Sequence, residues 1–67
     1  MGITDLLDVL RNASIAELTL RTLASTEWAN GNQTGPMNQA HKVAITNVIQ
    51  AAKQLLEAET AQHREGD

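Results

Sequence analysis

Four side chains in this sequence are of the kinds that perform acid–base chemistry or bind metal ions: His41, Glu27, Glu59 and His63. An enzyme must hold such groups in a cleft as a nucleophile, as a tuned acid or base, or around a metal. The chain has no cysteine, and its two histidines are too far apart in the sequence to form a local metal motif. We therefore expect a protein that is not an enzyme and that has no catalytic residue, metal, cofactor or small-molecule ligand.

His41 is the least ordinary of these residues, because it lies on the apolar face of the last predicted helix, between Met37 and Ile45. We interpret it as a partly buried histidine that hydrogen-bonds a carbonyl or a carboxylate, which a second copy of the chain could supply. A role in pH sensing is the alternative interpretation. Glu27 is the candidate partner, since antiparallel packing of the last two helices would bring its side chain towards His41.

The composition predicts one small domain. With 67 residues, 42% of them hydrophobic, the chain is short for a stable core of its own. It lacks the patterns of a signal peptide and of a membrane span, so we expect a cytoplasmic protein that does not contact membranes. The net charge of −3 disfavours general attraction to nucleic acids, although residues 31–56 carry Lys42 and Lys53 and no acidic residue.

Apolar spacing predicts an all-α fold of a short, a medium and a long helix that form a hairpin or bundle. Ile3, Leu6, Leu7 and Leu10 mark the first helix, at about residues 5–12. Ser14 and Glu17 match a capping box, which predicts a break and then a second helix at about 15–30. Gly31 ends that helix, and the third is expected at about 36–64, after a loop at 31–35 and before a frayed tail at 63–67.

The third predicted helix carries apolar residues over about half of its circumference. The second helix, about 24 Å long, would leave part of this wide face uncovered. A second copy of the chain would cover it and enlarge the core, so we expect a homodimer. The residues expected at the dimer seam are Ala44, Val48, Ala51, Ala52 and Leu55.

Two polar regions are candidate binding surfaces for an unidentified protein partner. One is the loop beside the single aromatic residue, and the other is a face of the third helix rich in amides, which are less costly to desolvate than ions. The residues are Trp28, Asn30, Asn32, Gln33, Gln39, Lys42, Thr46, Gln50 and Lys53. The alternatives are that Trp28 belongs to the core and that the amide face is merely solvated.

No motif of a known family is present, so the expected function rests on an analogy of size and general character: a small helical chain without cysteine. We expect a small regulator or inhibitor that acts by protein–protein interaction, covering a working surface of its partner, as accessory proteins of phages and plasmids do. One alternative is a DNA-associated factor that uses Lys42, Lys53 and Arg21 from a dimer. Another is a structural module whose long helix serves only to oligomerise.

Overall fold

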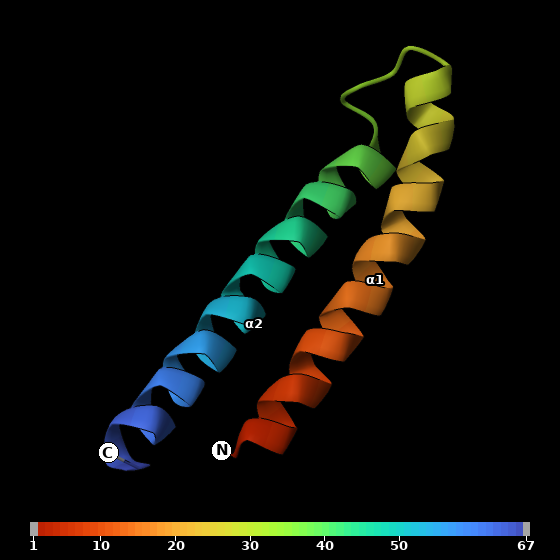
Figure 1. Ribbon diagram of the computed structural model, residues 1–67. Coiled ribbons are helices and arrows are strands. Elements are labelled where there is room, and N and C mark those ends of the chain that lie inside the picture. Colours follow the sequence, from red (N-terminus) through yellow and green to blue (C-terminus); the bar gives the residue numbers. More distant parts are fainter. Residues whose placement is uncertain (1, 67) are drawn as a thin grey trace.

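The computed structural model describes the backbone of residues 2–66 and the side chains of residues 2–62. Two helices, α1 (Ile3–Ala29) and α2 (Pro36–Gly66), lie side by side and run in opposite directions (Figure 1). Residues 30–35 join them at one end, and the start of α1 and the end of α2 lie at the other. The hairpin is a narrow rod with extents of 54 × 15 × 14 Å. The expected all-α class and helical hairpin are therefore confirmed for the described residues.

The predicted break between the first two helices is wrong, because α1 continues through residues 12–14. This segment contains neither glycine nor proline, and Ala13 is a strong helix former, so nothing interrupts the backbone hydrogen bonds. The predicted capping box is also absent, since the side chain of Glu17 bonds Arg21 and His41. The helix begins instead at Ile3, with the Gly2 N–H donating to the Asp5 carboxylate at 3.2 Å.

The loop and the second helix agree closely with expectation. Gly31 adopts a φ of 75°, the left-handed conformation predicted for the residue that ends the preceding helix. Pro36 occupies the first position of α2, where its missing N–H costs nothing. The backbone is helical as far as Gly66, while the side chains of the tail expected to fray, residues 63–67, and the backbone of Asp67 lie outside the described part of the chain.

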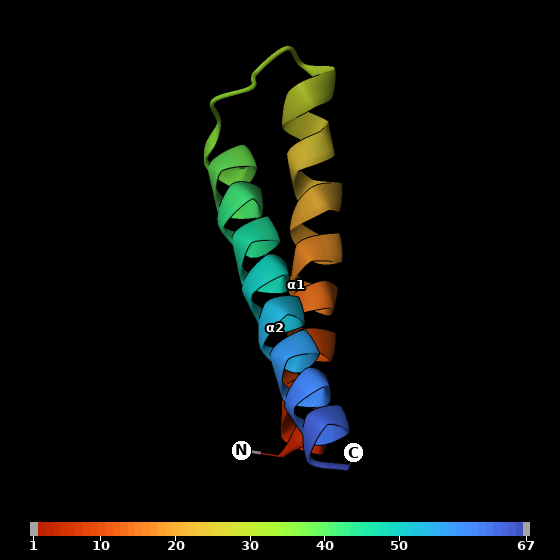
Figure 2. The same cartoon turned by 60° about the vertical axis from the view of Figure 1, so that its left-hand side comes forward.

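The helices pack through a seam in which buried or half-buried residues recur at intervals of three and four along each helix. On α1 these are Ile3, Leu6, Leu10, Ala13, Glu17, Leu20, Ala24 and Glu27. On α2 they are Met37, His41, Ala44, Val48, Ala51, Leu55 and Ala58. A seven-residue repeat on both helices is the pattern of a coiled coil, here antiparallel and formed within one chain. Figure 2 shows the shallow crossing of the two helices that accompanies such packing.

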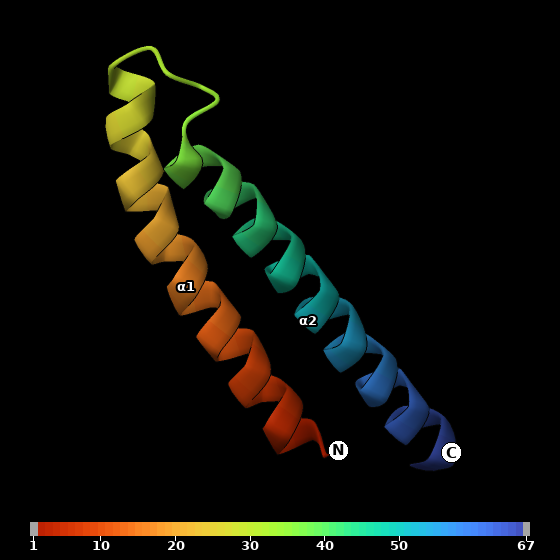
Figure 3. The same ribbon diagram turned by 180° about the vertical axis from the view of Figure 1, so that it is seen from behind.

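This seam takes up most of the residues predicted to join two copies of the chain. Ala44 and Ala51 are buried and Val48 and Leu55 half-buried, all of them in the seam with α1, whereas Ala52 is exposed. The prediction assumed a partner helix of about 24 Å. Because α1 is continuous, it lies beside α2 for nearly its whole length, as the view from behind shows (Figure 3).

The seam buries little apolar volume. Among the described side chains, Leu6 is the single large hydrophobic residue that is buried, and the other buried hydrophobic residues are alanines. Ten large hydrophobic residues are at least 39% exposed. By the seven-residue repeat, most of them lie on one side of the seam, which we call the apolar flank: Leu7, Leu18, Trp28, Ile45, Ile49 and Leu56, with Ala52 between them.

Candidate functional site

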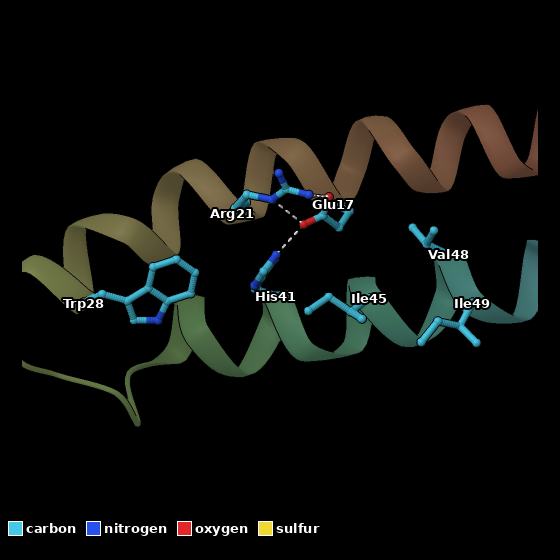
Figure 4. Close-up of a pocket in the computed structure, with 7 residues that line it drawn as sticks. All are labelled: Glu17, Arg21, Trp28, His41, Ile45, Val48 and Ile49. Carbon is cyan, nitrogen blue, oxygen red and sulfur yellow. Dashed lines mark hydrogen bonds and ion pairs between the residues drawn. The ribbon is translucent and has the colours of Figure 1, made fainter.

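A cluster of three charged or polar side chains interrupts the apolar seam. The Glu17 carboxylate lies 2.5 Å from Nε2 of His41, and it accepts hydrogen bonds from Nε and Nη2 of Arg21 at 2.8 and 2.5 Å (Figure 4). Glu17 and His41 are only 8% and 7% exposed, whereas Arg21 reaches solvent. The structure thus provides the carboxylate partner expected for His41, but from the same chain.

Electrostatics keep the Glu17 carboxylate ionised. The hydrogen bonds from Arg21, and after them the one from His41, hold the pKa of Glu17 below its usual value, while burial acts in the opposite direction. The same carboxylate raises the pKa of Arg21. An ionised carboxylate accepts hydrogen bonds and cannot donate one, so Nε2 of His41 is the donor. A carboxylate that is saturated in this way is a weak base, which suits a role in holding the helices in register.

The predicted bond between Glu27 and His41 is wrong. The Glu27 carboxylate accepts hydrogen bonds from the backbone N–H groups of Met37 at 3.2 Å and Asn38 at 2.7 Å. These groups belong to the first turn of α2, where N–H groups lack partners within the helix and favour negative charge. A residue of α1 therefore caps α2, and His41, one turn further along, pairs with Glu17 instead.

Gly35 makes this contact possible. A Cβ atom at this position would overlap the Glu27 carboxylate. We expect Gly35→Ala to displace that carboxylate from the end of α2 and to destabilise the hairpin by about 1–2 kcal/mol, the usual value of a helix cap. Urea unfolding followed by circular dichroism measures the effect.

Glu27→Gln is the variant to compare with Gly35→Ala, because both changes weaken the same contact between the Glu27 side chain and the first turn of α2. If the cap explains the effect of Gly35→Ala, the double variant will be little less stable than the worse of the two single variants. Fully additive losses would show that Gly35 matters for another reason.

Trp28 combines the two roles considered for it. Its indole N–H donates to Oδ1 of Asn38 at 2.8 Å, and its ring meets that of His41 edge-on, with centroids 5.7 Å apart. The residue is nevertheless 41% exposed. Asn38 is buried and also donates to the carbonyl of Gln33, so it connects the Trp28 ring to the loop. Asn38 is not among the residues predicted to bind a partner, because nothing in its sequence context distinguishes it from other amide residues.

A groove of about 450 Å³ opens on the apolar flank beside these residues. Ile45, Val48 and Ile49 line it from α2, and Trp28 stands at its end nearest the loop (Figure 4). The cluster of Glu17, Arg21 and His41 completes the lining with polar groups. The groove thus offers an apolar wall next to a cation, a combination suited to contact with another protein surface.

The remaining residues predicted to bind a partner are exposed but do not form one surface. Asn30, Asn32 and Gln33 lie in the loop at one end of the rod, where Oδ1 of Asn32 accepts the N–H of Thr34 at 3.3 Å. The others lie on α2, largely on the side opposite to α1: Gln39, Lys42, Thr46, Gln50 and Lys53. Trp28 faces the groove and is therefore separate from this amide face.

No family model, curated protein or solved structure matches this chain. Within the described residues, neither helix is long and apolar enough to cross a membrane. Across that same part of the chain, no three histidine or acidic side chains come together as a metal site would require.

Proposed function

We propose that this chain is a small non-enzymatic regulator, acting in the cytosol as a homodimer that binds and covers the surface of another protein. The observation that carries the proposal is the apolar flank, since more large hydrophobic residues are exposed than buried. The flank is continuous along α2 from Ile45 through Ile49 and Ala52 to Leu56, and exposed apolar surface of this kind marks sites of protein interaction.

The flank is best suited to a second copy of the hairpin. A two-helix domain whose buried hydrophobic residues are mostly alanines needs further burial to be stable. Two hairpins stacked on their apolar flanks form a four-helix bundle, in which each helix buries a second side. Exposed residues such as Ile49 then become part of a shared core.

Pairing of this kind leaves the loop and most of the amide face free for a foreign protein, since only Lys42 of that face lies at the edge of the apolar flank. Both carry uncharged hydrogen-bonding groups, which can be desolvated at low cost. Two copies of each surface on one rigid rod would cover an extended area of the partner. Occlusion by a small helical dimer is the mode of action expected of an inhibitor encoded by a phage or plasmid.

The mass in solution tests the pairing. We expect size exclusion with light scattering to give twice the 7.2 kDa of the chain over at least a tenfold range of concentration. Ile49→Glu should shift the protein to monomer, because each dimer would have to bury two unpaired carboxylates. Val43→Glu is the matched control, since Val43 is also exposed on α2 but lies on the other side of the seam.

A wild-type monomer at all concentrations would contradict the homodimer. Dissociation by Val43→Glu as readily as by Ile49→Glu would contradict the assignment of the interface to the apolar flank. Circular dichroism on each variant shows whether the hairpin itself is still helical.

A further inference from the structure

We propose that the two hairpins pair flank to flank and point in opposite directions, with a two-fold axis passing beside Leu18 and Ile49. This inference rests on the homodimer proposed above and specifies how the apolar flank meets its copy. In this arrangement α1 lies against α1 of the second copy and α2 against α2. The loop end of each hairpin lies beside the chain termini of the other.

Side chains on the flank lie in four levels from the loop to the termini. The seven-residue repeat spaces these levels by about 10 Å. They are occupied by Trp28 and Asn38, then Arg21 and Ile45, then Ser14 and Ala52, and lastly Leu7 and Glu59. The hydrogen bond between Trp28 and Asn38 and the shared groove of Arg21 and Ile45 fix the first two pairs.

The sizes of these side chains favour opposite directions. Turning the second copy end for end places its small level, Ser14 and Ala52, over the large level of Arg21 and Ile45. In hairpins that point the same way, the large side chains of Arg21 and Ile45 would meet their own copies at one level. The small side chains of Ser14 and Ala52 would meet their own copies at the next level. That stacking would leave a void beside Ser14, whereas cores pack without voids larger than a water molecule. The groove beside Trp28 would then be closed by the second copy.

Area and charge agree with this arrangement. One side of the rod measures about 54 by 15 Å, or about 800 Å², so a dimer that used the whole side would reach the area that each partner contributes to a standard stable interface. The opposed direction also brings Lys42 of one copy towards Glu59 of the other, at both ends of the interface. Pointing the same way, the hairpins would place their two Arg21 guanidinium groups at one level.

Cysteine cross-linking tests the direction, because the wild-type chain has no cysteine. In the proposed dimer Leu18 faces its own copy, and so does Ile49. We expect Leu18→Cys alone and Ile49→Cys alone each to form a disulfide-linked dimer in a glutathione buffer, at least about tenfold faster than Val43→Cys on the other side of the seam. Mixing Arg11→Cys with Ser25→Cys should likewise give the mixed dimer.

Each result has a distinct meaning. Cross-linking of Leu18→Cys only to Ile49→Cys, with neither linking to itself, would show hairpins that point the same way and would overturn the proposal. Dimers by mass in which no flank cysteine links faster than Val43→Cys would place the interface elsewhere. A monomer by light scattering would instead overturn the homodimer itself, so the two proposals fail in different ways.

Discussion

Glu17→Leu will lower the midpoint of thermal unfolding by roughly 5–15 °C, although leucine is a favoured residue at seam positions. The reason is that His41 is buried and Glu17 is its hydrogen-bond partner. Leucine leaves the imidazole without that partner in an apolar seam. His41→Leu should cost less, because Arg21 still holds the Glu17 carboxylate.

Replacing both residues by leucine should raise the midpoint above that of the wild type. A buried polar pair is often less stabilising than apolar residues of similar size, although loss of one partner is costly. From the lowest to the highest midpoint of thermal unfolding, the expected order is therefore Glu17→Leu, His41→Leu, wild type and the double variant. Thr46→Leu, on the exposed side of α2, is the control for added apolar surface. A double variant less stable than both single variants would contradict this account.

The same carboxylate gives stability a pH dependence. Because the pKa of Glu17 is lower in the folded protein than its usual value of 4.5, ionised Glu17 stabilises the fold at pH values above 4.5. This contribution is lost as the pH falls below 4.5 towards the folded pKa. Urea midpoints measured from pH 7 to pH 3 should decline more steeply for the wild type than for Glu17→Gln.

Ile15→Pro should destabilise the protein by about 3 kcal/mol or more, since proline in the interior of a helix removes a hydrogen bond and clashes with the preceding turn. Ile15 is 57% exposed, so little packing is lost when its side chain is changed. At the predicted start of a separate second helix, by contrast, proline at this position would be harmless. Unfolding in urea therefore tests the continuity of α1.

Ile15→Ala separates the effect of the proline ring from the loss of the isoleucine side chain. It should stay within about 0.5 kcal/mol of the wild type, as expected for an exposed position. A similarly small effect of Ile15→Pro would contradict a continuous helix.

Local patterns in the sequence predicted most of the backbone. The loop, the left-handed Gly31 and the start of α2 at Pro36 depend on neighbouring residues, and all three were correct. The predicted break before Ile15 is wrong because the capping signal at Ser14 is local, and the packing of the whole helix overrides it. Residues 12–14 can continue a helix, and packing against α2 in the seam stabilises the continuous helix.

The site was harder to predict because its contacts join residues far apart in the sequence. The spacing of Ser14 and Glu17 matches a local cap, and this local match hides Glu17 as a partner for His41. Glu27 was correctly placed near the loop, but backbone N–H groups competed successfully with the imidazole for its carboxylate. A count of seven-residue intervals on both helices would have placed Glu17 and His41 in the same seam.

Because the seam repeats every seven residues, the length of the rod can change only by whole seven-residue repeats. Removing residues 4–10 from α1 together with residues 55–61 from α2 would shorten the rod by about 10 Å and leave every other seam residue opposite its present neighbour. Removing any other small number would rotate part of one helix out of the seam. Insertions and deletions in relatives of this chain should therefore comprise seven residues in α1 together with seven residues at the opposite position in α2.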